Sequence, residues 1–385
     1  MSKTKKICFI VNNAAFFVSH RLNLAIAAIK KGHSVTIVHG NAGNEKMELS
    51  AFEVLERHKI NFRSFPLKGS STNLINEFIS LFRLFLVIKE IKPDLVHCIS
   101  PKGVLYGGLI ARLINVKSLV LSISGMGYIF TATKSDRLAK KALRRIFKLI
   151  ISFILKHENK TVIVQNSEDF KEFEELCKDE EVVLIPGSGV DLSKYKHVDL
   201  RTKEKKIVLA GRMLVDKGIY EFYTAAKALK KKYQDWEFIL MGAAGYDNPS
   251  SISADEIRSW EKSGCIDWYD YEQDISKTLI KSSIVCLPSY REGMPKILLE
   301  AAASGCAVVT SNATGCIESV IPNKTANISK IGCSDSLTEA LEDLILNKSK
   351  RLNYSNEAIK LAHEKFDIRI VTSRIIKIYH KLLQF

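Results

Sequence analysis

The hydrophobic positions of this chain fall into short apolar runs, separated by longer stretches in which apolar residues recur with helical spacing. Continuous apolar runs of this kind are typical of strands buried on both faces of a parallel sheet. In the first half we predict seven strands, Ile7–Val11, Ser34–His39, Phe62–Pro66, Leu95–Ser100, Ser118–Ser124, Thr161–Gln165 and Val182–Ile185. Helices are predicted between them at Ser19–Lys31, Lys46–His58, Asn73–Ile91, Gly103–Ile114, Asp136–His157 and Glu168–Lys178.

The same alternation restarts after a polar stretch at residues 191–205. The predicted strands of the second half are Ile207–Ala210, Glu237–Met241, Cys265–Tyr269, Ile284–Pro288 and Ala307–Ser311, and a helix is predicted at Ile219–Lys232. A chain of 385 residues is long for one hydrophobic core. We therefore predict two doubly wound, Rossmann-like α/β domains at 1–190 and 206–364, a linker at 191–205 and a last helix within 365–385.

The segment after the fourth strand of the second half combines two acids with a helix start. Glu292 lies in a short loop, Pro295 stands at the predicted first helical position, and Glu300 follows within the helix. The backbone amides of Lys296 and Ile297 would then be available to bind a phosphate. The two carboxylates suit hydroxyl pairs on a ribose and on a sugar, which outlines a nucleotide-sugar pocket. Two glutamates at this spacing can also be solvated charges beside a helix.

A second segment supplies cations at the end of the strand Ile207–Ala210. Arg212 follows the strand, and Asp216 is predicted to cap the next helix with Lys217 in its first turn. The helix macrodipole disfavours a cation at that place, so Lys217 indicates a bound anion. Arg212 can fork two phosphate oxygens, and Lys217 can act as a point charge. The alternative is a pair of ordinary surface cations.

Together these segments resemble the retaining GT-B glycosyltransferases of family 4, which share a G-R-x(4)-K-G and an E-G-x-P-x(4)-E segment. Pro186–Asp191 is similar to the family's P-x-G-V-D segment. The run Ser100-Pro101-Lys102, with Gly107 and Ala111-Arg112 beyond it, is similar to that of members that build bacterial surface polysaccharides. The resemblance implies an acceptor-binding domain and a nucleotide-sugar domain that face each other across a cleft, with the last helix crossing back to the first domain.

The resemblance also implies an activity and the residues that carry it. The activity is transfer of an N-acetylhexosamine from a UDP-sugar to an undecaprenyl-diphosphate-linked saccharide. The implied catalytic residues are Arg212 and Lys217 on the donor diphosphate and Glu292 on the sugar, with Glu300 on the ribose. The donor site is completed by Gly293, Met294, Pro295, Lys296 and Ile297. We expect no cofactor and no metal ion, because no D-x-D motif or cluster of metal ligands accompanies the pocket.

Composition fits an enzyme of a reducing compartment. The eight cysteines show no C-x-x-C spacing, and Cys8, Cys98 and Cys286 lie in apolar runs, which indicates buried thiols. The first apolar run is too short for a signal peptide, and no stretch is apolar enough to span a membrane. We therefore expect a cytoplasmic protein.

The positive charge is concentrated in the first half of the chain. Residues 1–200 hold 30 Lys and Arg against 19 Asp and Glu, a net of +11, whereas residues 201–385 hold 27 against 23, a net of +4. The basic, amphipathic segment 134–160 carries most of the excess, and the stretch Phe78–Ile91 is similar. Such helices suit an anionic membrane surface, here the inner face of the cell membrane, although many of their apolar residues must also pack on the sheet. Without a recognisable module or stacking aromatics, we expect no nucleic-acid partner.

The acceptor side is less distinctive. Asn13 and Phe17 are predicted in a glycine-free loop after the first strand, where Phe17 and His20 would meet a lipid-linked acceptor. His20 could instead belong to an exposed first turn. Lys102 at a helix start suggests a nearby anion, such as the acceptor diphosphate, and Gly125 follows the fifth strand. Many family members carry His-Gly there, whereas this chain has Ser124, so any role of that histidine is lost.

The predicted reaction breaks a bond between an anomeric carbon and a phosphate oxygen. The cations and helix amides would stabilise the leaving diphosphate electrostatically. The family's retaining course is usually explained by same-face attack, in which the departing phosphate accepts the acceptor's proton. Two alternatives stay open: an epimerase or phosphorylase of the same fold, and a non-enzymatic protein that binds membranes.

Overall fold

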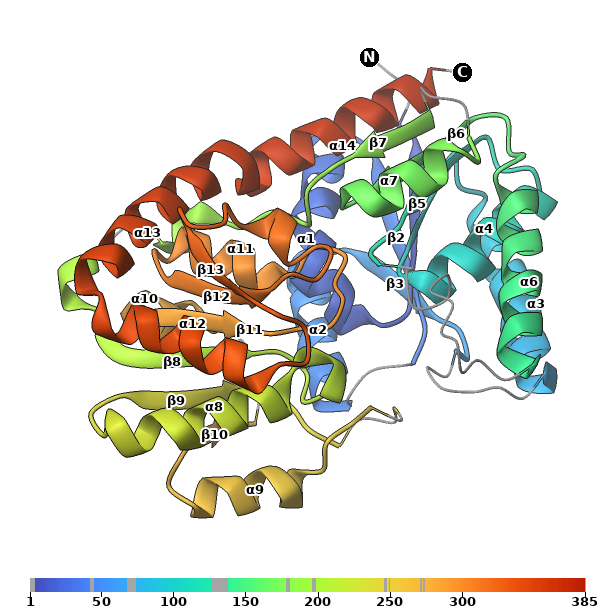
Figure 1. Cartoon of the computed structure of the whole chain (residues 1–385). Helices are drawn as coiled ribbons and strands as arrows, with labels where there is room; N and C mark the ends of the chain where they lie inside the picture. The colour runs from blue at the N-terminus through green and yellow to red at the C-terminus, as the bar shows by residue number, and fades with distance from the viewer. Residues whose placement is uncertain are drawn as a thin grey trace. The chain divides into compact units, whose positions relative to one another are not determined.

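The computed structural model describes residues 4–41, 45–67, 74–125, 138–177, 181–195, 199–245, 248, 250–270, 272 and 274–384. The chain forms two compact units (Figure 1). Unit 1 comprises Met1–Ile185 and Val371–Phe385, and unit 2 comprises Pro186–Ile370. The first boundary therefore falls after Ile185 and not after residue 190, and the predicted linker 191–205 lies inside unit 2, where β8 already begins at Glu204.

Unit 1 is built on a seven-stranded parallel sheet in the order β3-β2-β1-β4-β5-β6-β7. Its strands are β1 (Lys6–Val11), β2 (Ser34–His39), β3 (Asn61–Ser64), β4 (Leu95–Ile99), β5 (Ser118–Ser122), β6 (Lys160–Val164) and β7 (Val182–Leu184). Its helices are α1 (Ala14–Lys30), α2 (Glu45–Arg57), α3 (Leu74–Ile91), α4 (Gly108–Leu113), α6 (Leu138–Ile154), α7 (Ser167–Glu174) and α14 (Ile368–Leu383). A π-helical turn, Gly103–Gly107, leads into α4.

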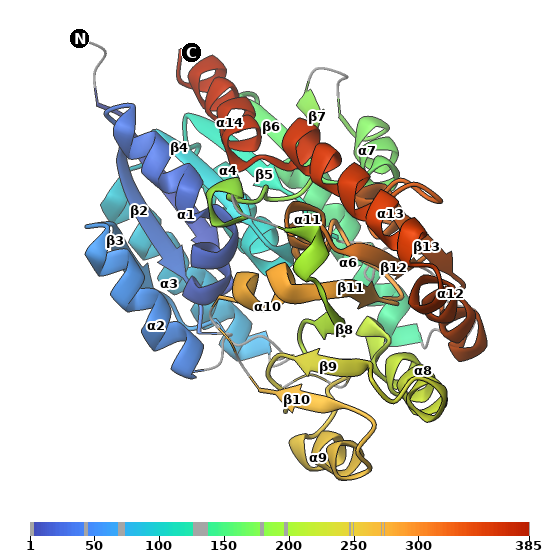
Figure 2. The same cartoon turned by 90° about the vertical axis from the view of Figure 1, so that its left-hand side faces the viewer.

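Two hydrophobic cores cover the two faces of this sheet. On one face α3, α4, α6 and α7 pack together, and on the other α1, α2 and α14 do so. Figure 2 shows unit 1 from the side of α1 and α2. From Val371 onward α14 belongs to unit 1, where Ile375 and Tyr379 are buried in the core that α1 shares.

Unit 2 has a six-stranded parallel sheet in the order β10-β9-β8-β11-β12-β13. Its strands are β8 (Glu204–Ala210), β9 (Glu237–Met241), β10 (Asp267–Tyr269), β11 (Ser282–Leu287), β12 (Ala307–Ser311) and β13 (Ala326–Ser329). Its helices are α8 (Ile219–Lys232), α9 (Ala254–Lys262), α10 (Ser276–Lys281), α11 (Lys296–Ala303), α12 (Ser334–Leu346) and α13 (Lys348–Leu361). Helices α8, α9 and α12 cover one face, and α10 and α11 the other. Two doubly wound parallel sheets confirm the predicted fold class.

Helix α1 begins earlier than the predicted start at Ser19. The predicted loop at Asn13–Phe17 is helical from Ala14, because the Asn13 side chain caps the helix and accepts a hydrogen bond from the Phe16 amide at 2.7 Å. The Glu48 carboxylate accepts from the amides of Ala14 and Ala15 at 2.9 and 3.0 Å. A carboxylate of the protein thus occupies the place where a dinucleotide fold binds phosphate.

Candidate active site

The candidate site is built at the topological switch point of the unit 2 sheet. There β8 and β11 are neighbours, although their following helices lie on opposite faces. Ligands of doubly wound sheets bind at the carboxyl ends of the strands at such a point. Arg212 follows β8 and Glu292 follows β11, so the fold brings the two segments found in the sequence to one edge of one sheet.

The first segment differs in detail from its prediction. Asp216 and Lys217 do not open α8 but form a short 3-10 turn, Val215–Lys217. Gly218 follows with a φ of +73°, and α8 begins at Ile219. A Cβ on Gly218 would lie 2.3 Å from the Pro288 carbonyl oxygen, so the two loops approach as closely as backbone allows.

Hydrogen bonds join these two loops. The Asp216 carbonyl oxygen accepts from the Tyr290 amide at 2.9 Å and lies 2.9 Å from the Ser289 hydroxyl. The Tyr290 hydroxyl donates to Glu221 Oε1 of α8 at 2.6 Å, and burial together with this bond raises the pKa of Tyr290 to about 12. Sequence reasoning missed Ser289, Tyr290 and Glu221; their only signal is the Pro-Ser-Tyr run directly before Arg291 and Glu292.

Glu292 stands at the centre of the site. Its Oε1 contacts Lys217 Nζ and lies 2.8 Å from the Ser289 hydroxyl, and its amide donates to the Thr314 carbonyl at 3.2 Å. The side chain is only 12% exposed and its lysine partner 19%. Burial, followed by the Glu292 charge, raises the pKa of the Cys316 thiol to about 12.

The second acid, Glu300, lies one helix turn beyond the first amides of α11. Pro295 is the N-cap of α11 and not its first residue, so the helix begins at Lys296. The Lys296 and Ile297 amides belong to the first turn, whose N–H groups have no acceptor within the helix. Lys296 Nζ pairs with Glu300 at 2.8 Å, and Glu300 is 13% exposed.

This arrangement holds three cationic side chains and the positive end of a helix beside two carboxylates. Arg212 is exposed, while Lys217 and Lys296 are partly buried. Cations and helix amides together can bind a diphosphate, and carboxylates can accept hydrogen bonds from vicinal hydroxyls. Gly293 and Met294 lie in the loop between β11 and α11. This loop is tightly packed against Gly315, because a Cβ on Gly315 would lie 2.4 Å from the carbonyl oxygens of Glu292 and Gly293.

The predicted acceptor-side residues all lie in unit 1, and the structure corrects one of them. Phe17 is fully buried in the core and meets Phe9 edge-on at 5.1 Å, so it cannot meet a lipid. Lys102 Nζ lies 3.1 Å from Glu77 Oε1 of α3, so one anion beside Lys102 is a side chain of the protein. His20 stacks on Phe16 at 4.1 Å between ring centroids.

The predicted residue Gly125 ends a described range of unit 1, and the buried His97 of β4 has a structural role. Gly125 has a φ of +85° and is the last described residue before 126–137, so the neighbouring Met126 and Gly127 lie outside the described residues. His97 is fully buried between the Tyr379 hydroxyl at 2.5 Å and the Ser122 hydroxyl at 2.6 Å.

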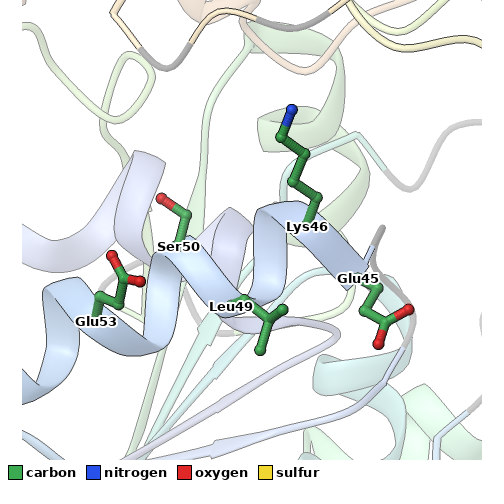
Figure 3. Close-up of a pocket in the computed structure, with 5 residues that line it drawn as sticks. All are labelled: Glu45, Lys46, Leu49, Ser50 and Glu53. Carbon is green, nitrogen blue, oxygen red and sulfur yellow. The ribbon is translucent and has the colours of Figure 1, made fainter.

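A hollow along α2 is the other surface feature of note (Figure 3). It is lined by Glu45, Lys46, Leu49, Ser50 and Glu53. All five side chains project from one helix of unit 1, and among the described residues no second element contributes a converging group. The hollow therefore lacks the chemistry of an active site.

In the described ranges, no helix is both long and apolar enough to span a bilayer. Nor do three or more His, Cys, Asp or Glu side chains gather there in a way that would hold a metal ion.

Two parallel-sheet α/β units define the class of protein: this is the architecture of the GT-B glycosyltransferases. Anabaena HepE, solved in complex with UDP, has the same fold with a TM-score of 0.74 at 15% identity, over 98% of this chain and all of that one. A family model described as "Glycosyl transferase 4-like" matches residues 6–166, and one described as "Glycosyl transferases group 1" matches residues 193–361. The chain belongs to the family 4 glycosyltransferases and is a hexosyltransferase, as its motifs predicted.

Characterised relatives share less than a third of their residues with this chain. An N,N'-diacetylbacillosaminyl-diphospho-undecaprenol α-1,3-N-acetylgalactosaminyltransferase of Campylobacter jejuni is 27% identical over 80% of this chain and 84% of its own length. A UDP-Gal:α-D-GlcNAc-diphosphoundecaprenol α-1,3-galactosyltransferase of Escherichia coli is 26% identical over 65% of this chain and 66% of its own.

Proposed function

We propose that this enzyme transfers an N-acetylhexosamine, with retention, from a UDP-sugar to an undecaprenyl-diphosphate-linked saccharide during bacterial surface polysaccharide assembly. The relatives named above act on undecaprenyl-diphosphate-linked sugars, and one of them moves an N-acetylhexosamine. The observation that carries the donor half is the contact of Lys217 with Glu292 at the β8–β11 switch point, where the loop of Arg212 and the start of α11 also lie.

Each group then has one role. Arg212, Lys217 and the Lys296 and Ile297 amides hold the donor diphosphate and stabilise the charge that develops on it as the glycosidic bond breaks. Glu292 accepts hydrogen bonds from the donor sugar and orients its anomeric carbon. Glu300 accepts from the ribose. The acceptor hydroxyl attacks from the face that the diphosphate leaves, and a phosphate oxygen takes its proton, so no side chain has to act as base.

The cations of the site favour a reaction that does not depend on a divalent ion. Fixed positive charge already faces the leaving group, so we expect transfer to persist in EDTA. The acceptor's polyprenyl chain places the enzyme at the inner face of the cell membrane, held peripherally through its basic segment 134–160. We expect the protein to be cytoplasmic.

The test is a transfer assay with labelled UDP-N-acetylhexosamines and undecaprenyl-diphosphate-linked acceptors. Arg212→Ala and Glu292→Ala should each lower transfer at least about a hundredfold. Their matched controls are Arg201→Ala, whose side chain is 89% exposed, and Glu339→Ala on the surface of α12; both should leave transfer unchanged. NMR of the product linkage decides retention. Donor turnover without any acceptor would point instead to an epimerase or phosphorylase.

A further inference from the structure

Helix α3 of unit 1 presents an apolar stripe to the solvent. Five large apolar side chains are exposed on it: Ile75 at 71%, Phe78 at 70%, Ile79 at 45%, Phe82 at 53% and Leu86 at 43%. Their spacing of i, i+3, i+4, i+7 and i+11 places them along one side of the helix. Single exposed apolar residues are ordinary, but a continuous stripe with two phenylalanines marks a binding surface.

The stripe is not the edge of the core face. The buried side chains of α3 are Ser80, Leu84 and Ile88, at intervals of four residues. At about 100° per residue, these three point almost opposite to the stripe. The helix is therefore apolar on two opposite sides, and only one of them packs on the sheet.

Helix α6, which packs on the same core as α3, has the same double character. It buries Phe147, Ile151 and Ile154, and it exposes Ile146 at 54%, Leu149 at 66% and Phe153 at 39%. Exposed cations flank these apolar residues: Arg145, Lys148 and Lys156. Because both helices pack inward on one core, their exposed sides face away from the same face of the sheet (Figure 1, right). Of the basic segment 134–160, residues 134–137 lie outside the described residues.

Charge decides which partner fits this surface. A second copy of the chain in a two-fold contact would bring the cations of one α6 against those of the other, which repel. An anionic phospholipid bilayer attracts these cations to its headgroups and accepts apolar side chains beneath them. Lys89 lies one turn beyond the stripe, and its Nζ is 5.6 Å from the centroid of the Phe85 ring. The aliphatic part of Lys89 can therefore lie along apolar surface while its ammonium group stays at headgroup level.

We propose that Phe78 and Phe82 of α3 insert into the acyl region of an anionic phospholipid bilayer, while the cations of α6 bind its headgroups. This inference rests on the lipid-linked acceptor proposed above, which is embedded in such a bilayer. It assigns insertion to α3, a helix that is not part of the basic segment 134–160. The two helices then contribute different forces: α6 supplies salt-sensitive attraction, and α3 supplies salt-insensitive burial.

Depth of insertion can be measured with a tryptophan at Phe82. The three native tryptophans, Trp236, Trp260 and Trp268, all lie in unit 2 and supply a constant background. On vesicles of phosphatidylcholine and phosphatidylglycerol, the added emission of Phe82→Trp should shift to the blue and be quenched by lipids brominated in the acyl chain. A Leu346→Trp control on α12 of unit 2, where Leu346 is 63% exposed, should show neither change. An unshifted Phe82→Trp on vesicles that bind the protein would overturn the proposal.

Vesicle sedimentation separates the two forces. Phe78→Ser with Phe82→Ser should weaken binding by about a hundredfold or more at every salt concentration, roughly tenfold for each phenylalanine. Arg145→Glu with Lys156→Glu should weaken binding chiefly at low salt, and Leu346→Ser should have no effect. Equal salt dependence of the two double variants would contradict the division of roles. If the wild-type protein is a dimer and Phe78→Ser makes it monomeric, the stripe is instead a contact between two copies of the chain.

The proposed function can fail independently of this inference. A UDP thermal shift reports on the unit 2 site and should be unchanged in the phenylalanine variants. If wild-type protein binds vesicles through Phe82 but shows no UDP shift and no transfer, the proposed function fails and the membrane surface stands. If UDP binds and transfer occurs without insertion, only the membrane inference fails.

Discussion

Glu292 and Glu300 each pair with a lysine of the proposed donor site. Lys217 contacts Glu292, and Lys296 lies 2.8 Å from Glu300. Both pairs are at least two-thirds buried, so their charges are only partly screened. In the proposed function, donor binding would transfer the lysines from carboxylate to phosphate while the sugar and ribose hydroxyls replace them on the carboxylates. UDP alone would then draw Lys217 away but offer Glu292 no sugar hydroxyl in return.

This exchange predicts an unusual effect of Glu292→Gln on product affinity. Because Lys217 is then released, UDP should bind about threefold to tenfold more tightly than to wild type, whereas transfer is lost. Isothermal titration calorimetry with UDP measures the change. Glu339→Gln, which alters net charge equally on the exposed side of α12, should leave UDP affinity as it is. Weaker UDP binding by Glu292→Gln would show that no exchange takes place.

A buried carboxylate next to the site gives a second residue-scale prediction. Glu221 is 8% exposed, its Oε1 accepts from Tyr290, and its Oε2 has no partner among the described residues. Tyr290→Phe removes the donor that Glu221 has, and should lower the free energy of unfolding of unit 2 by about 1–3 kcal/mol. Replacing both partners, as Tyr290→Phe with Glu221→Leu, should recover most of that loss. Urea unfolding followed by tryptophan fluorescence measures both; a double variant no more stable than the single one would exclude the mechanism.

At the scale of elements, the β8–α8 and β11–α11 connections hold each other in place. Gly218 combines a φ of +73° with a backbone contact that leaves no room for a Cβ, while Gly264 has a similar φ of +72° and open space around it. Gly264→Ala should therefore lower the free energy of unfolding only by the strain of a left-handed backbone, about 1–2 kcal/mol. Gly218→Ala should cost more, since the Pro288 carbonyl must also move. Equal losses in urea unfolding would show that the two loops do not constrain each other.

Elements with a clear hydrophobic pattern were predictable from the sequence, whereas elements whose ends are fixed by tertiary contacts were not. The strands Ser34–His39, Glu237–Met241 and Ala307–Ser311 are predicted to the residue, because apolar runs in a parallel sheet admit few other structures. The start of α1 was missed although Asn13 caps it locally, since the Glu48 carboxylate that also accepts from its first amide lies 34 residues away from Ala14. Strand β13 was missed because Ala326–Ser329 has only four residues and no apolar run.

The site shows the same division. Residues proposed to bind a ligand through one charged group, such as Arg212, Lys217 and Glu292, carry a signal in their type and spacing. Residues that position those groups do not: the bond from Tyr290 to Glu221 spans 69 residues and looks like any surface pair until the sheet is built. Lys102 carried the same kind of signal, and its Nζ lies 3.1 Å from Glu77 of α3, as Lys217 lies beside Glu292.

At the scale of the whole molecule, the two units differ in how protons act on their stability. In unit 1, burial lowers the pKa of His97 well below its ordinary value of 6.5, and burial also lowers the pKa of His157. His97 is enclosed by Tyr379 and Ser122, and the nearby Arg21 charge lowers its pKa further. In unit 2, Lys324 and Lys360 lower the pKa of Glu357 to about 2 from an ordinary 4.5. The pKa of Asp343 is lowered by a lysine partner and that of Asp367 by an arginine partner.

The sign of each effect follows from which state binds more protons. As pH falls below about 6.5, the unfolded chain protonates His97 and His157 while folded unit 1 keeps them neutral, so unit 1 loses stability first. Glu357, Asp343 and Asp367 contribute stability above their unfolded pKa values, and unit 2 loses it only as pH falls from about 4.5 towards 2. The units should therefore unfold separately in acid.

The placement of tryptophan makes this separation measurable in the intact chain. Unit 1 has no tryptophan, while Trp236, Trp260 and Trp268 lie in unit 2, so tryptophan emission reports unit 2 and far-UV circular dichroism reports both units. In a fixed, moderate urea concentration, lowering the pH from 7 should reduce ellipticity before the emission changes. His97→Gln should delay the loss of ellipticity relative to its own pH 7 value, because glutamine does not titrate. Coincident loss of both signals at all pH values would mean that the two units unfold as one and that the buried histidines do not set the acid limit of unit 1.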